Sequence, residues 1–217
     1  MRKKISRIIV ILLVLGVTFM YAIQRYHGRS VQSAFPELFS EDIEYRFHAY
    51  ATKLTGKQSL YVAKLEQQES ISRTSYAKIL WVDLPPMIVK VDVPVEYNYY
   101  INLSSGWSFR PFGEGIIVKV PELSSSTPAI NIAKLKMTVE EGGLLRNEKK
   151  ALEKMTQELP GLLIDRSIEN RHLVREQAKK SVEEFVRNWI HQVTSRPFDR
   201  PIQVQFSAEI PGENTKN

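Results

Sequence analysis

The residues with the clearest capacity for metal chemistry are the four histidines, His27, His48, His172 and His191. Only His172 has an acidic residue, Glu176, four positions further along a predicted helix, a spacing that places two side chains on one face. Catalytic zinc takes three protein ligands, and the chain has neither an H-E-x-x-H motif nor a cysteine. We therefore expect no metal site and interpret His172 and Glu176 as a pair on a solvated helix face.

Hydroxyl side chains gather in two short segments, 104–108 (SSGWS) and 124–127 (SSST). Neither segment has the G-x-S-x-G or S-x-x-K pattern that surrounds a nucleophilic serine. The segment 113–115 (GEG) lacks the further glycine or lysine of a phosphate-binding loop. We therefore predict no catalytic residue and no cofactor, and expect that these segments are turns.

An aromatic segment between two predicted strands is the best candidate for a binding site. It contains Trp107, Phe109, Arg110 and Phe112 within a predicted loop over 104–115. Tryptophan and arginine are enriched where protein partners bind most tightly. The more common role of such aromatic rings is to fold back and cap the core, and the functional alternative is a partner-binding surface formed by these four candidate residues.

The elements that position these residues follow an apolar N-terminal segment, 8–23 (IIVILLVLGVTFMYAI), which contains no charged residue. We predict a transmembrane helix that contacts the lipid bilayer, in a single-pass protein of the inner or plasma membrane. Basic residues precede the segment, so the N-terminus is expected in the cytoplasm and the main domain in the periplasm or outside the cell. The alternative is a cleaved signal peptide, although no pair of small residues marks a cleavage site.

The net charge of +6 comes from the N-terminal segment. The first 29 residues contain six basic side chains and no acidic one, so residues 30–217 contain 24 of each sign. A neutral domain has no general attraction for polyanions, and we expect no nucleic-acid partner.

Strand patterns dominate the middle of the chain. The strongest covers 87–103, where apolar and polar residues alternate as in a half-buried antiparallel strand. Pro94 removes a backbone donor from this strand and predicts an edge or a bulge there, and a shift of phase between Ile132 and Leu135 predicts a second irregularity. Further strands are predicted over 60–65, 79–82, 116–120, 130–139 and 202–206. For 43–51 the pattern fits a strand or a short helix, and we favour the strand.

Two helices are predicted over 144–159 and 162–193, separated at Pro160 because proline disfavours a helical conformation in the residue before it. An apolar stripe on the second helix, from Val174 to Val193, is expected to pack on the apolar face of strand 87–103.

The order of strands, then helices, then a strand predicts an α+β fold: a transmembrane helix followed by an antiparallel sheet, two C-terminal helices and a closing strand. The predicted organisation is a cytoplasmic stub and anchor (1–29), a linker that leads into the domain (30–57), an α+β extracytoplasmic domain (58–210) and a disordered tail (211–217).

Three segments, 96–100 (EYNYY), 116–122 (IIVKVPE) and 175–178 (REQA), resemble a bacterial family described as domain of unknown function 4230. The resemblance covers about residues 55–195. It implies a membrane anchor, a strand-rich middle and a long late helix, and it implies no catalytic residue.

We therefore expect a membrane-tethered cell-envelope protein that is not an enzyme and that binds a protein partner or itself. Two alternatives remain open: an envelope hydrolase with a site assembled from scattered carboxylates and hydroxyls, and a domain that binds a small ligand or lipid.

Overall fold

The computed structural model describes residues 16, 18–19, 31–55, 58–141 and 147–209, and its contacts divide the chain into two compact units. Unit 1 contains Met1–Leu60, Ile101–Glu122 and Lys179–Asn217, and unit 2 contains Tyr61–Tyr100 and Leu123–Ala178. The single domain predicted over 58–210 contributes residues to both units.

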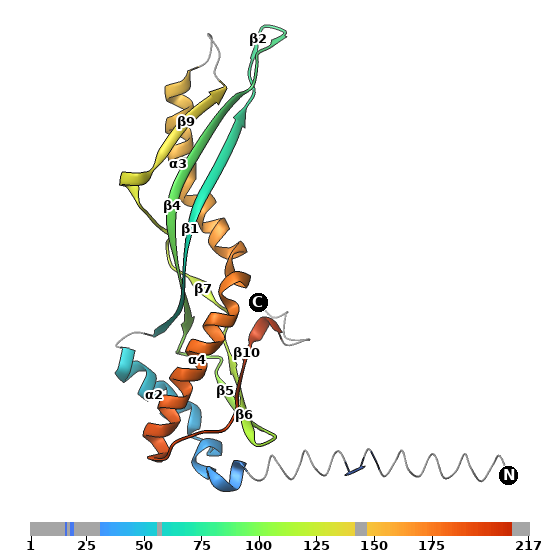
Figure 1. The fold of residues 1–217 in the computed structure, drawn as a ribbon, viewed down its shortest axis with the longest axis vertical. Coiled ribbons are helices and arrows are strands. Elements are labelled where there is room, and N and C mark those ends of the chain that lie inside the picture. The colour runs from blue at the N-terminus through green and yellow to red at the C-terminus, as the bar shows by residue number, and fades with distance from the viewer. Residues whose placement is uncertain (1–15, 17, 20–30, 56–57, 142–146, 210–217) are drawn as a thin grey trace, which may run out of the picture. The chain divides into compact units, whose positions relative to one another are not determined.

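Unit 2 is built on a sheet in which β4 (Met87–Asn102) is the central strand (Figure 1). β1 pairs along one edge of β4, and three short strands pair antiparallel along the other edge, one after another. The paired strands are β1 (Ser59–Ser75), β7 (Ser124–Ser125), β8 (Ala129–Ile130) and β9 (Lys136–Glu141). β4 confirms the predicted strand, and its odd-numbered residues are all buried.

The irregularity predicted at Pro94 is present. Asn131 N–H donates to the Pro94 carbonyl oxygen, 3.2 Å away, and Lys136 already pairs with Asp92. The residues between these two partners form a 3-10 helix, η2 (Ile132–Lys134), so the strand predicted over 130–139 is interrupted. Because proline has no N–H to donate, the partner strand loses little by leaving the ladder here.

The two long helices are α3 (Glu148–Glu169) and α4 (Arg171–Thr194), and they meet at Asn170 instead of the predicted Pro160. Pro160 lies inside α3. Buried residues recur every four positions across it: Met155, Leu159, Leu163 and Ser167. Tertiary packing of this face stabilises the helix more than one lost backbone hydrogen bond destabilises it.

The apolar stripe of α4 is divided between the units, contrary to the prediction that it covers strand 87–103. Phe185 and Trp189 belong to unit 1, where their rings lie 6.0 and 5.0 Å from the ring of Phe47. In unit 2, the Tyr99 hydroxyl of β4 donates to the Ser167 carbonyl of α3, 3.0 Å away. α3 therefore contacts the buried face of β4 (Figure 1).

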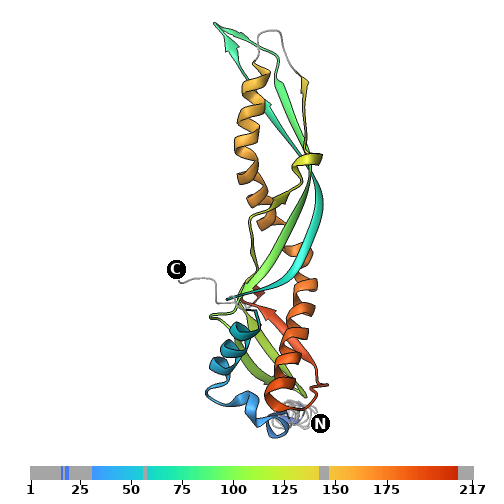
Figure 2. The ribbon, with the colours of Figure 1, turned by 90° about the vertical axis from the view of Figure 1, so that its left-hand side faces the viewer.

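Unit 1 contains a second sheet of the order β10-β6-β5 (Figure 2). Its strands are β5 (Ser108–Phe112), β6 (Gly115–Val120) and β10 (Ile202–Phe206). The closing strand is present, but it pairs in parallel with β6 and does not join the sheet of β4. β5 lies within the predicted loop over 104–115 and forms a hairpin with β6.

The predicted strand at 43–51 is wrong, because this segment lies in the helix α2 (Ile43–Thr55). α2 buries Ile43, Phe47 and Ala51, which lie four positions apart on one face. The predicted linker over 30–57 therefore contains α2 and also a 3-10 helix, η1 (Pro36–Phe39).

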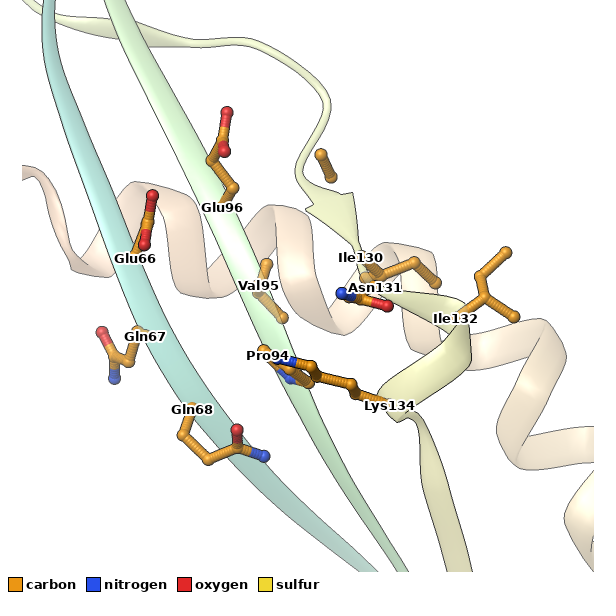
Figure 3. Close-up of a pocket in the computed structure, with 11 residues that line it drawn as sticks. Glu66, Gln67, Gln68, Pro94, Val95, Glu96, Ile130, Asn131, Ile132 and Lys134 are labelled. Carbon is orange, nitrogen blue, oxygen red and sulfur yellow. The ribbon is translucent and has the colours of Figure 1, made fainter.

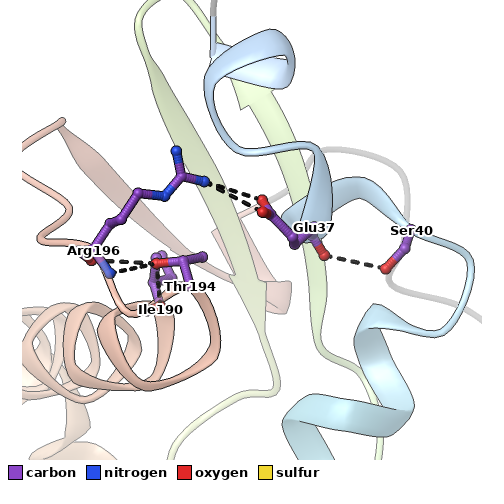
Figure 4. A network of polar contacts seen from close by, with 5 residues as sticks. All are labelled: Glu37, Ser40, Ile190, Thr194 and Arg196. Atoms are coloured by element: carbon purple, nitrogen blue, oxygen red, sulfur yellow. Dashed lines mark hydrogen bonds and ion pairs between the residues drawn. The ribbon is translucent and has the colours of Figure 1, made fainter.

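Polar contacts join η1 to the end of α4 in unit 1 (Figure 4). One guanidinium nitrogen of Arg196 lies 3.3 Å from each carboxylate oxygen of Glu37. The Thr194 hydroxyl donates to the Ile190 carbonyl and accepts from Arg196 N–H. The Arg196 guanidinium also lies 4.7 Å above the ring of Phe35, which adds a cation–π contact.

The part of the predicted fold class that is corrected is its first element, the N-terminal transmembrane helix. Within the part of the chain that the structure describes, no helix combines the length and the apolar character that crossing a bilayer requires. Most of the segment 8–23 and all of the tail over 211–217 lie outside the described residues. What stands is an α+β fold with an antiparallel sheet and helices. The predicted lipid contact and cellular location stay predictions.

Candidate interaction site

The four residues of the predicted aromatic site do not share one surface. Trp107 is 2% exposed, and its indole N–H donates to the Asn102 carbonyl oxygen, 2.8 Å away. The half-buried ring of Phe109 lies 4.9 Å from the ring of Trp189. Trp107 and Phe109 therefore pack into unit 1, whereas Arg110 and Phe112 are exposed on β5.

This division predicts separable effects on stability. We expect Phe112→Ala to change the free energy of unfolding by less than about 0.5 kcal/mol, because its ring is 56% exposed. Trp107→Phe is expected to cost about 1 kcal/mol, because the Asn102 carbonyl loses its donor. Urea unfolding of both variants checks this. Equal stability of the two would contradict the placement of Trp107 in the core.

A hairpin at the end of the unit 2 sheet exposes a cluster of large apolar side chains. Its strands are β2 (Lys78–Ile79) and β3 (Val82–Asp83), joined by Leu80 and Trp81 (Figure 1). The exposed fractions are high: Tyr76 80%, Leu80 80%, Trp81 88% and Val82 62%. We call Leu80, Trp81 and Val82, at the turn, the hairpin tip; Tyr76 lies just before the base of the hairpin. Clustered apolar side chains in water are a common mark of interaction sites.

The backbone of the tip is strained. Leu80 has a φ of +54°, in the left-handed region where glycine, asparagine and aspartate are usual in two-residue hairpin turns. A bulky side chain in this conformation costs about 1–2 kcal/mol. Strain combined with exposure of an apolar side chain has no benefit for folding, so it points to a function for the Leu80 side chain.

The two charged side chains at the base of the hairpin neutralise each other. Lys78 and Asp83 face each other across the hairpin, and their side chains form an ion pair of 3.0 Å. Leu84 N–H also donates to the Ala77 carbonyl, 2.9 Å away, which closes the base of the hairpin. The ladder and the ion pair therefore hold the tip in place although its side chains have few neighbours.

A groove of about 730 Å³ crosses the solvent-facing side of the same sheet (Figure 3). Pro94 lies between its two walls, which are formed by β1 and by the interrupted partner strand. In Figure 3 a helix passes behind the sheet, away from this groove. The residues that line it include Glu66, Gln68, Glu96, Ile132 and Lys134. Charged, polar and apolar side chains all line the groove, and the groove is open to solvent.

Charges beside the groove are linked through Lys64. Its ammonium nitrogen lies 2.7 Å from Glu66 and 2.7 Å from Glu96. The hydrogen bonds that Lys64 donates to these two carboxylates raise the pKa of Lys64 above its ordinary value. The same lysine, together with the Asn98 amide, lowers the pKa of Glu96. Glu96 is therefore ionised at neutral pH and lacks the character of a general acid.

A buried polar cluster lies between the sheet and α3 in unit 2. The Tyr97 hydroxyl donates to Glu69, 2.8 Å away, and Glu69 is only 5% exposed. Burial and the bond to Glu69 raise the pKa of Tyr97, and burial raises the pKa of Tyr99. The Ser125 and Ser167 hydroxyls lie 2.7 Å apart. These groups satisfy one another, as expected for a buried network that holds packing in place.

The three histidines that the structure describes do not assemble a site with this cluster, and His27 lies outside the described residues. His172 lies in unit 2 and contacts the Glu169 carbonyl oxygen at 2.7 Å, whereas His48 and His191 belong to unit 1. Among the described residues, no group of three or more His, Cys, Asp or Glu side chains has the arrangement that a metal ion needs. A small pocket of about 280 Å³ does lie between the sheet and α3, but the ion pair of Arg73 and Glu158 lines it.

Comparisons with family models, with curated proteins and with solved structures found no match. The resemblance to the family of unknown function 4230 therefore stays a prediction.

Sequence reasoning assigned 79–82 to a strand and missed the hairpin tip. The pattern that could have revealed it is the unbroken apolar run from Ile79 to Val82 between two charged residues, Lys78 and Asp83. A strand with one face in water alternates, so an unbroken run requires either burial on both sides or an interaction partner.

Proposed function

We propose that this protein is a non-enzymatic interaction module that binds a protein partner through the hairpin tip. The observation that carries the proposal is the exposure of Leu80, Trp81 and Val82 at the turn of the hairpin, with the exposed Tyr76 just before its base. Tyrosine and tryptophan are the residue types that contribute most binding energy at protein interfaces. The strained Leu80 adds an apolar side chain at the point that a partner reaches first.

Charge favours a protein partner over a lipid surface. Peripheral attachment to anionic lipids uses lysine and arginine beside the apolar side chains. At this hairpin the charge of Lys78 is neutralised by Asp83. A protein partner with an apolar pocket needs no such charge. It would bury the indole of Trp81 and leave the ion pair of Lys78 and Asp83 at the rim of the interface.

The test is crosslinking of the full chain in cells followed by mass spectrometry of the captured proteins. We expect Trp81→Ala to reduce capture of a reproducible partner at least tenfold, because loss of a central tryptophan costs about 2 kcal/mol or more. Ile132→Ala is the matched control, because Ile132 is also a large exposed apolar residue but lies away from the tip. Unchanged capture by Trp81→Ala would refute the proposal.

Leu80→Gly separates binding from folding. Glycine adopts positive φ without strain, so the variant is expected to be about 1 kcal/mol more stable than the parent chain. It is also expected to capture less partner, because the apolar side chain is gone. Thermal unfolding and crosslinking measure the two effects. A blue shift of Trp81 fluorescence on neutral phosphatidylcholine vesicles, lost in Trp81→Ala, would instead identify a lipid surface.

A further inference from the structure

The outer edge of β1 is a second surface, independent of the hairpin tip. β1 is the terminal strand in the sheet order, and no described strand pairs with its outer edge. Figure 2 shows β1 bowing outward from β4 with no other described ribbon beyond its middle part. Its 17 residues make it long for a strand.

Natural sheets protect such edges, since unpaired N–H and C=O groups offer a template for another strand. Common protections are proline, a short strand, a bulge or an outward lysine. β1 is long and contains no proline or glycine. Its one lysine, Lys64, forms ion pairs with Glu66 and Glu96 of the same sheet, so its charge gives the edge little protection against another strand.

The side chains along the edge are only partly covered. Leu65 and Gln67 are half-buried on the helix-facing side, whereas Val91, Val93 and Val95 of the neighbouring strand are buried. A further strand beside β1 would bury Leu65 more completely, and removing apolar surface from water favours association.

We propose that two copies of this chain join by antiparallel pairing of their β1 strands, with Leu65 on the two-fold axis. In this register each Lys64 lies opposite Glu66 of the other copy, and Leu65 lies opposite itself. Opposite charges directly across antiparallel strands stabilise the pair, and like charges destabilise it.

The neighbouring registers are disfavoured by the same charges. Moving the axis by one residue places either two Lys64 side chains or two Glu66 side chains opposite each other. Pairing around Leu65 also keeps the helix-facing side chains of both copies on the same side of the joined sheet, because a strand's faces alternate with a period of two. The strand's own sequence therefore selects a second copy and one register.

The absence of cysteine from the chain makes the register directly measurable. In Leu65→Cys, the two Cα atoms of the paired strands are expected about 4.5–5.5 Å apart, within reach of a disulfide. Gln67→Cys is the matched control. In the proposed register its two copies lie four residues apart along the strand, about 13 Å, which is too far for a disulfide.

We expect mild oxidation to convert Leu65→Cys to a covalent dimer at least tenfold faster than Gln67→Cys or Ala63→Cys alone. A mixture of the last two variants is expected to form a heterodimer, because position 63 of one copy lies opposite position 67 of the other. Light scattering of the unmodified chain should show a concentration-dependent dimer.

Three results would overturn the proposal: no faster crosslinking at position 65, preferential crosslinking of Gln67→Cys with itself, or disulfide capture of a different protein in cells by the Leu65→Cys variant. The hairpin tip is unaltered in all these variants. Failure here therefore leaves the proposed function standing, and loss of partner capture at Trp81 leaves the dimer standing.

Discussion

Gly115→Ala is expected to destabilise the sheet of unit 1 by about 4 kcal/mol or more. A Cβ added at Gly115 would overlap the carbonyl oxygen of Pro201 and lie 2.9 Å from its carbonyl carbon. These are backbone atoms, so no side-chain rotation relieves the contact. The same carbonyl accepts the Ile116 N–H at 3.0 Å, and moving it away would break this bond beside β10. Overpacking against an immobile neighbour belongs to the most destabilising class of substitution.

Urea unfolding followed by tryptophan fluorescence measures this effect, because the buried Trp107 and Trp189 both belong to unit 1. Gly161→Ala is the control. Gly161 lies inside α3 with nothing within 4 Å of an added Cβ, so alanine there is expected to stabilise by about 0.5–1 kcal/mol. If Gly115→Ala unfolds at the same urea concentration as the parent chain, the close contact between position 115 and the Pro201 carbonyl is contradicted.

Tyr97→Phe is expected to reduce the stability of unit 2 by about 3 kcal/mol. The substitution removes the hydroxyl that donates to Glu69 and leaves a buried carboxylate without that donor. Tyr100→Phe, on the solvent-facing side of the same strand, is expected to change stability by less than about 0.5 kcal/mol. Hydrogen exchange of β4 amides, measured with thermal unfolding, checks both variants.

A double variant shows whether the lost stability of Tyr97→Phe comes from the Glu69 carboxylate that is left without its donor. We expect Tyr97→Phe with Glu69→Leu to recover most of the lost stability, because replacing both partners by apolar groups leaves nothing unsatisfied. If the double variant is as unstable as the sum of the single ones, the bond from Tyr97 to Glu69 contributes nothing.

The raised pKa values of Tyr97 and Tyr99 add a dependence on pH. In the unfolded chain tyrosine ionises near pH 10. The folded chain keeps these two protons to higher pH, so above about pH 10 it binds more protons than the unfolded chain does. Stability therefore falls as pH rises beyond that point. Thermal unfolding across this range should show the decline, and it should be smaller in Tyr97→Phe.

Local sequence patterns predicted the elements that alternate cleanly or repeat with a helical period. The alternation of 87–103 gave β4, and Pro94 gave the interruption of its partner strand. The boundary between α3 and α4 was wrong, because the local effect of Pro160 was given more weight than the packing of Met155, Leu159 and Leu163 around it. Packing of this kind depends on residues far away in the chain.

The division into units and the parallel pairing of β10 depend on long-range contacts that no local pattern contains. The candidate site was missed for a related reason. Composition identified aromatic residues at 107–112, but only the structure shows that Trp107 is buried by Phe47, whose ring lies 4.6 Å away, and that Trp81 is not. Exposure is a property of the whole fold, whereas residue type is a property of one position.

The pairing of β6 with β10 constrains how the chain is completed on the ribosome. β6 ends at Val120 and its partner begins at Ile202, so 82 residues of synthesis separate them. At a synthesis rate of about 5–20 residues per second, about 4–16 s pass between the completion of β6 and the start of β10. All residues of unit 2 are made by Ala178, before β10 exists. Nascent chains halted far enough beyond Ala178 for unit 2 to leave the ribosome, but with Ile202 still inside it, should therefore protect β4 from proteolysis and leave β6 open to cleavage.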